Sequence, residues 1–514
     1  MKLYLKENSV LLFLAIVLSF AFAFITKDFF SGDSSIYFTY FKNFFTLPFS
    51  YQPNHVNFGS TSPMHTLIFS CIYALSGDNW IFVVKFFNFL FIELSFLILI
   101  SFFKNKIILF FVLNTLFLMP PLMFFAGQVY ETGIIFLSLA LLILFLKKNE
   151  YTKLIILSGS LYLVRPEMAL FTIYIYLYVI FKKRDKNIIL LMFLSLMPNI
   201  LYHVYVAIMS YEFIPTSVYG RYITAIENQK TYLERLFFSL SFIRSNILYI
   251  ILIFVYIVAI VYALLRKQNY ILLILIGLVF ALYLINPPGY LILRYLSIAL
   301  PLMFYICIFL IDKLIVRRRF YLLSFTVFVF FCIGFVKWID RAEQKTYLND
   351  LTLNDILLKD LSLKLNPILQ KNDKILIYEI QGQYYIDAYC ISLDSIVGSD
   401  FLNVNIKKQS FLDFLNANHD IKYIVTMNSF DYRRIYKDMF LSKLYLHDLN
   451  SNMGESIKFH NYLFTKILTN PKFLQAPRTK YIIEDLNSNN GYLKLYSGRH
   501  PMWNSVYKIE AIDE

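Results

Sequence analysis

Residues 80–103 read WIFVVKFFNFLFIELSFLILISFF, and the basic stretch Lys104-Asn105-Lys106 follows directly. An apolar run of this length can cross a bilayer, because an α-helix needs about 20 residues to span the hydrocarbon core. Lysines that flank such a run are typical of its cytoplasmic end. This stretch therefore predicts a membrane helix that ends in the cytoplasm.

The rest of the chain repeats this pattern. Of its 514 residues, 58% are hydrophobic and 16% are charged, which predicts a polytopic α-helical membrane protein. The net charge is +14, but the lysines and arginines gather in short connections between apolar runs. That placement indicates membrane topology and argues against nucleic acid as a partner. Neither the four cysteines nor the seven histidines show a metal-binding spacing, so no metal and no cofactor are predicted.

The basic connections set the orientation, because all of them should lie in the cytoplasm together with the N-terminus. They are 104–106, 147–148, 182–186, 266–267 and 317–319. The run 64–77 is short and is interpreted as a juxtamembrane or re-entrant helix. The other runs give about eleven transmembrane helices, with the N-terminus in the cytoplasm and the C-terminal region on the exterior side. The expected spans are 10–25, 80–103, 107–125, 132–147, 153–164, 168–182, 187–209, 246–265, 270–286, 293–312 and 319–337.

The chain is expected to divide into two domains. Residues 1–344 would form the transmembrane domain, with its first exterior loop at 27–63. Residues 345–514 would form a soluble α/β domain in the periplasm or outside the cell, because charge rises there and apolar runs shorten to strand length. Strands are predicted at 375–378, 423–425, 445–446, 481–483 and 492–496, and a helix at 410–415.

The first exterior loop opens with Ser31-Gly32-Asp33-Ser34-Ser35-Ile36-Tyr37 and closes with Phe58-Gly59-Ser60-Thr61-Ser62-Pro63. A carboxylate just outside a membrane helix, facing a loop that can fold over it, is suited to deprotonate a hydroxyl. Asp33 is therefore the candidate general base. The alternative is that Asp33 only caps the helix that follows it.

Later exterior segments supply candidates for substrate binding. Arg165 and Glu167 flank a proline between two short apolar runs, where they would either face a cavity or hold a broken helix together. Glu131 would hydrogen-bond a substrate hydroxyl or cap the next helix.

Two further arginines are candidates for phosphate binding, because the guanidinium fork matches phosphate oxygens. Arg294 follows a Pro-Pro-Gly turn, and its alternative role is to extend to the membrane interface. Arg221 lies close to Tyr219 in the loop after the 187–209 run.

In sequence order, these motifs resemble the GT-C class of membrane glycosyltransferases, and most of all its bacterial group of terminal arabinofuranosyltransferases. The resemblance covers most of the chain. It is carried by 32–40 (GDSSIYFTY), 59–65 (GSTSPMH), 128–132 (QVYET), 164–168 (VRPEM), 211–221 (YEFIPTSVYGR), 294–296 (RYL) and 394–398 (DSIVG).

The resemblance implies an inverting glycosyltransferase with Asp33 as the catalytic base. The donor would be a polyprenyl-phosphate-linked sugar, and the acceptor a cell-envelope glycan, lipid or protein. The substrate-binding residues would be Ser62, His65, Glu131, Arg165, Glu167, Tyr219, Arg221 and Arg294. This chain departs from the group at Gly32, where many members carry a first Asp, and at Met64 and His65, where the group has Leu-Trp.

Three other functions remain open. An O-antigen polymerase or ligase would rely on large late exterior loops rather than on an acidic first loop. A non-enzymatic transporter or flippase of lipid-linked glycans would carry ionisable residues near the middle of the membrane and paired half-repeats. A membrane anchor for the C-terminal domain would tolerate any change at Asp33.

Overall fold

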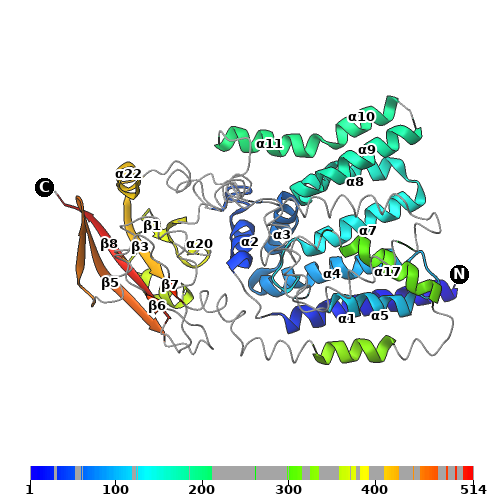
Figure 1. Cartoon of the computed structure of the whole chain (residues 1–514), viewed down its shortest axis with the longest axis horizontal. Coiled ribbons are helices and arrows are strands. Elements are labelled where there is room, and N and C mark those ends of the chain that lie inside the picture. The colour runs from blue at the N-terminus through cyan, green and yellow to red at the C-terminus, as the bar shows by residue number, and fades with distance from the viewer. Residues whose placement is uncertain are drawn as a thin grey trace. The chain divides into compact units, whose positions relative to one another are not determined.

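The computed structural model describes the segments that are coloured in Figure 1. These are residues 2–27, 32–51, 60, 62–118, 123, 126–183, 186–210, 261, 298, 300–314, 324–334, 358–370, 372–377, 382–392, 410–427, 444, 452–472, 482–483, 493–494 and 502–512. They belong to two compact units. The helical unit comprises Met1–Phe29, Thr61–Ile214 and Thr224–Trp338, and the sheet unit comprises Phe30–Ser60, Pro215–Ile223 and Ile339–Glu514.

In the helical unit, the apolar runs form α-helices. They are α1 (Lys2–Ile25), α3 (Pro63–Leu75), α4 (Trp80–Ile100), α5 (Lys106–Phe117), α7 (Thr132–Lys148), α8 (Tyr151–Val164), α9 (Ala169–Lys183), α10 (Lys186–Ser195), α11 (Met197–Ser210) and α17 (Leu300–Leu314). A further apolar helix occupies Ser324–Gly334. Short 3₁₀ turns, η1 (Gly77–Asn79) and η2 (Pro166–Met168), precede α4 and α9.

Some helix boundaries differ from the sequence prediction. α5 ends at Phe117, short of the expected 125. The run expected as one helix over 187–209 is divided at Leu196, because Pro198 lacks a backbone N–H and fits only the first turn of a new helix. Apart from residue 261, the expected spans 246–265 and 270–286 lie outside the described residues.

By length and composition, two helical stretches in the described part of the chain could cross a membrane. They are Pro63–Ile100, with 38 residues, and Lys186–Met209, with 24. The first stretch includes the run 64–77, which was predicted to lie beside the main span. Shorter apolar helices occupy Ser9–Ile25, Lys106–Phe117, Tyr151–Val164, Leu300–Phe309 and Ser324–Gly334.

Aromatic side chains fill the centre of the helical unit. The ring of Phe96 on α4 lies 5.9 Å from Phe117, 6.1 Å from Phe136 and 6.2 Å from Phe304, measured between centroids. Edge-to-face pairs at such distances stabilise a core beyond the area that they bury. These rings therefore join α4, α5, α7 and α17 into one packed group.

α4 and α7 approach each other closely at Gly133. A Cβ atom at this position would lie 2.3 Å from Oδ1 of Asn88 and 2.5 Å from its carbonyl oxygen. The Asn88 side chain also accepts a 3.1 Å hydrogen bond from the Gly133 backbone N–H. Only glycine fits here without a shift of the two helices.

We expect Gly133→Ala to destabilise the helical unit by about 1–3 kcal/mol, because the added methyl group overlaps the α4 backbone. The thermal midpoint of the purified protein in detergent measures this loss. Gly334→Ala is the matched control, since a Cβ there meets nothing within 4 Å. Equal midpoints for the two variants would contradict the close contact.

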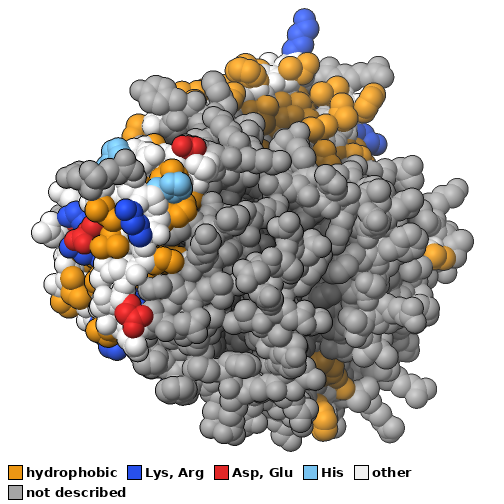
Figure 2. All heavy atoms as spheres, turned by 60° about the vertical axis from the view of Figure 1, so that its left-hand side comes forward, with side chains coloured by type: hydrophobic (Ala, Val, Ile, Leu, Met, Phe, Trp, Pro, Cys, Tyr) orange, Lys and Arg blue, Asp and Glu red, His pale blue; other side chains and the backbone are white. Residues whose placement is uncertain are grey.

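The helices α9, α10 and α11 carry apolar side chains on their outer faces. These side chains repeat every three or four residues, so each helix presents an apolar stripe to the surroundings and not only to its neighbours. Apolar side chains gather at the top of Figure 2, at the level of α10 and α11 in Figure 1. The exposed residues are Ile173, Leu177, Ile180, Phe181, Ile189, Leu190, Phe193, Leu194, Ile200, Leu201, Val204 and Ile208.

The sheet unit is built on a six-stranded mixed sheet with the strand order β2-β1-β3-β8-β5-β4. Strands β1 (Lys374–Ile377), β2 (Tyr389–Ser392) and β3 (Ile421–Met427) are parallel. Strands β8 (Met502–Ala511), β5 (Tyr462–Lys472) and β4 (Ser456–Phe459) continue the sheet in antiparallel fashion. A separate pair, β6 (Ile482–Ile483) and β7 (Leu493–Lys494), is antiparallel.

Side chains alternate between the two faces of this sheet, as the two-residue period of a strand requires. Leu376 and Ile424 pack on one face with α22 (Phe411–Ala417), while Ile375 and Val425 pack on the other with the helical residues 358–365. α22 begins after Ser410, whose hydroxyl accepts a hydrogen bond from the Asp413 backbone N–H. This N-cap explains the helix that the sequence predicted at 410–415.

Most of the first exterior loop belongs to the sheet unit. Residues 30–60 group with 339–514, although the sequence analysis assigned 27–63 to the membrane domain. Helix α2 (Gly32–Asn43) packs against α20 (Gly382–Tyr385), about 340 residues later in the chain. The division between the two units is therefore not a single cut near residue 344.

Candidate functional site

The sequence Val164-Arg165-Pro166-Glu167 folds into a sharp junction between α8 and η2. The residue before a proline is driven away from helical backbone angles, and Arg165 is indeed extended, with φ −159° and ψ 139°. Pro166 then starts η2, where a missing N–H costs nothing. The junction brings Arg165 and Glu167 together beside Glu131, which directly precedes α7.

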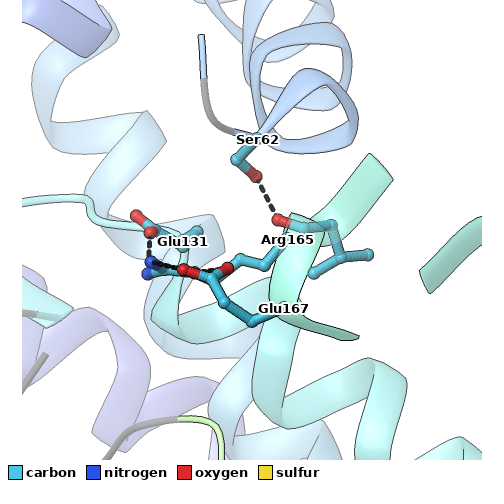
Figure 3. Close-up of polar contacts among 5 residues, drawn as sticks. Ser62, Glu131, Arg165 and Glu167 are labelled. Atoms are coloured by element: carbon cyan, nitrogen blue, oxygen red, sulfur yellow. Dashed lines mark hydrogen bonds and ion pairs between the residues drawn. The ribbon is translucent and has the colours of Figure 1, made fainter. Parts of the chain in front are cut away.

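Arg165 joins these segments through its guanidinium group (Figure 3). Its Nε and Nη2 donate to the two carboxylate oxygens of Glu167, at 3.2 Å and 3.1 Å. Its Nη1 donates to Oε1 of Glu131. Arg165 therefore forms a bidentate ion pair with Glu167 and a second ion pair with Glu131, which lies 34 positions away in the chain.

Burial decides what this triad can do. The Arg165 side chain is fully buried and that of Glu131 is 1% exposed, whereas the side chain of Glu167 is 19% exposed. One cation faces two carboxylates, so the three side chains together carry a charge of about −1 when all are ionised. Glu167 is the member that an outside molecule reaches most easily, while Arg165 binds the ends of α7 and α8 together.

Ser62, at the end of the first exterior loop, contacts the junction between α8 and η2. Ser62 is the N-cap residue of α3, but its hydroxyl donates to the backbone carbonyl of Val164 at 2.7 Å instead of capping α3 (Figure 3). This contact satisfies a carbonyl in the last turn of α8. His65, in the first turn of α3, is fully buried, and its ring lies 4.6 Å from the ring of Phe69.

Two buried polar residues in the run 80–103 support this end of the helical unit. Lys85 Nζ donates to the carbonyls of Thr26 and Lys27, at 2.5 Å and 3.0 Å, and so caps the end of α1. Asn88 donates to the carbonyl of Ala126 at 2.8 Å. Sequence reasoning missed both residues. Their signal was a lysine and an asparagine three positions apart, on one face of an otherwise apolar helix.

A second cluster that the sequence analysis missed lies on α8 and α11. Nε2 of His203 hydrogen-bonds the hydroxyl of Tyr162 at 2.9 Å, and the two rings lie 5.3 Å apart. The ring of Tyr202 lies 5.4 Å from that of His203. Tyr162 stands one helical turn before Arg165, so this cluster extends the polar end of the bundle toward α11.

The opposite ends of the helices carry basic residues. Lys183, in the last turn of α9, lies over the ring of Tyr151 at the start of α8, with Nζ 5.1 Å from the ring centre. Asn105, between Lys104 and Lys106, donates to Asp312 at 3.1 Å. In the described part of the helical unit, the Arg165 triad and these basic turns thus lie at opposite ends of α8.

The structure describes less of the other residues that the sequence predicted for the site. Asp33 lies in the first turn of α2, within the sheet unit, and its backbone is helical. Tyr219, Arg221 and Arg294 lie outside the described residues. Over the described ranges, no group of three His, Cys, Asp or Glu side chains could hold a metal ion.

No protein-family model matches the chain, and no curated protein matches it.

Proposed function

We propose that the chain is a polytopic membrane glycosyltransferase that transfers a sugar from a polyprenyl-phosphate donor to a cell-envelope glycan, lipid or protein. The transfer would take place at the outer face of a bacterial inner membrane. One observation carries the proposal. Ser62, Glu131, Arg165 and Glu167, which come from three separate motifs of the sequence, converge at one end of the helical unit (Figure 3).

Two features support a membrane setting for this site. The outward apolar stripes of α9, α10 and α11 place exposed large hydrophobic side chains on three successive helices, and water-soluble proteins rarely expose large contiguous apolar patches. The basic turns at Asn105 and Lys183 and the carboxylates at Glu131 and Glu167 lie at opposite helix ends, as the positive-inside rule requires of a site on the outer face.

The chemistry follows from the roles assigned to the side chains. The Asp33 carboxylate takes the proton from the acceptor hydroxyl, whose oxygen attacks the anomeric carbon of the donor sugar. The bond between that carbon and the phosphate oxygen breaks, and polyprenyl phosphate leaves with the electron pair. Arg294 and Arg221 would stabilise the departing phosphate, while Glu167 would accept hydrogen bonds from sugar hydroxyls. Arg165 would act mainly by holding Glu167 in place.

One observation favours a second function, a transporter or flippase of lipid-linked glycans. Glu93, in the middle of α4, is 1% exposed and accepts a 3.2 Å hydrogen bond from Asn114 on α5. Its Oε1 has no hydrogen-bond partner within the described part of the structure. An ionisable group inside an apolar helix is typical of a transport path.

A transfer assay tests the proposed function. Membranes from cells that express the protein receive a panel of radiolabelled polyprenyl-phosphate sugars, and membranes without it serve as the control. We expect label in acceptor material only with the protein present. No label from any donor, at verified protein levels, would contradict the proposal.

A further inference from the structure

Helix α2, which carries Asp33, is held by the C-terminal part of the sheet unit. The ring of Phe38 lies 6.3 Å from the ring of Tyr384 on α20, and Nζ of Lys42 lies 4.7 Å from the centre of the same ring. Tyr384 therefore contacts two successive turns of α2, through an aromatic pair and a cation–π contact.

The helix α20 is itself fixed to the parallel strands. The Gln383 side chain donates to the carbonyl of Ala388 and accepts from the backbone N–H of Cys390, both at 2.9 Å. Gly382 sits so close to β1 that a Cβ would lie 2.7 Å from Cδ1 of Ile377. Tyr384 therefore contacts α2 from a helix that is itself held against β1 and β2.

Further contacts of α2 lie within the sheet unit. Nδ2 of Asn43 donates to the carbonyl of Tyr51 at 2.7 Å, and the ring of Tyr40 lies 5.8 Å from that of Tyr51. Burial lowers the pKa of Lys42 below its ordinary value, and the nearby charge of Asp387 opposes this shift. Part of the Lys42 side chain stays exposed to solvent, while its ammonium group lies against the Tyr384 ring.

We propose that Tyr384 and Lys42 are positioning residues, through which the C-terminal part of the chain holds α2 and with it the backbone of Asp33. The proposal rests on the function proposed above. Because α2 is a single 12-residue helix, a shift at Lys42 is transmitted to Asp33. Misplacement of a catalytic group by about 1 Å can cost 100-fold in rate. The C-terminal part of the chain then contributes to catalysis by positioning α2, and is not a separate acceptor-binding module.

The test combines kinetics with hydrogen exchange of residues 34–43 in the full-length protein. Tyr384→Ala should lower kcat by about 10- to 100-fold with little change in KM for the donor. It should also speed exchange in α2. Tyr384→Phe keeps the ring and should behave like the wild type. Lys42→Met should lower kcat and Lys42→Arg should restore it, because arginine keeps the cation–π contact.

Lys374→Met is the matched control. Nζ of Lys374 lies 5.6 Å from the ring centre of Tyr389, so this variant removes the same kind of contact within the sheet, away from α2. Unchanged exchange of 34–43 in Tyr384→Ala would overturn the inference, as would faster exchange with wild-type kcat. Hydrogen exchange is measured without substrate, so it tests the contact between Tyr384 and α2 by itself. If the wild type shows no transfer, it is the proposed function that fails.

Discussion

Replacing Asp33 by Asn is expected to lower kcat by about 100- to 10,000-fold, the usual contribution of a general base. Asn keeps the size of the side chain and its ability to cap a helix, but it cannot take a proton at neutral pH. Donor KM should change little, since the loss concerns the transition state alone. Initial rates of sugar transfer, normalised to the amount of protein in the membrane, measure the effect.

Asp78→Asn is the control for this variant. Asp78 is an exposed carboxylate in η1, and its removal should leave the transfer rate unchanged. A wild-type rate in Asp33→Asn would reject Asp33 as the base. Glu167, the more exposed carboxylate of the Arg165 triad, would then be the next candidate.

Arg165→Met is expected to destabilise the helical unit by about 3–5 kcal/mol, because it leaves the buried carboxylate of Glu131 without its partner. Methionine keeps most of the volume, so the loss measures mainly the broken ion pairs. Glu167 is partly exposed and can be solvated, so Glu167→Gln should cost much less. Thermal midpoints of the purified variants in one detergent give the comparison.

The double variant Arg165→Met/Glu131→Gln separates structure from substrate binding. Removing both fully buried charges should recover much of the stability that Arg165→Met loses, because the carboxylate that remains, Glu167, is partly exposed and can be solvated. A stable but inactive double variant would indicate that the triad serves substrate binding, through Glu131 itself or through the position that Arg165 gives Glu167. A single variant Arg165→Met as stable as the wild type would contradict the bracing role of the triad.

Local signals in the sequence located several elements well. The apolar run 153–164 predicted the end of α8, and the helix predicted at 410–415 matches the start of α22; in the structure a proline and an N-cap serine, which act over only a few residues, set these two boundaries. The strands β1, β3, β6 and β7 lie where short apolar runs predicted them. Strands β2, β4, β5 and β8 were missed, although β5 and β8 pair with each other along ten positions. Pairing of this kind depends on the partner strand, so a single segment of sequence gives little sign of it.

The long-range contacts could not be read from the chain in the same way. The sequence suggested an Arg165–Glu167 pair, but not the contact of Arg165 with Glu131, which depends on how α7 packs beside α8. Nor does any periodicity relate Lys42 to Tyr384, which meet only because residues 30–60 fold with the C-terminal part. Such contacts are set by packing between elements and carry no local pattern.

The most direct test of the account uses the purified protein in liposomes with a labelled polyprenyl-phosphate sugar and an acceptor. The account predicts that one polyprenyl phosphate is released for each sugar transferred, and that the product has the inverted anomeric configuration. If the donor remains chemically intact, the result contradicts glycosyl transfer. If the intact donor also moves between the leaflets, the result favours a transporter.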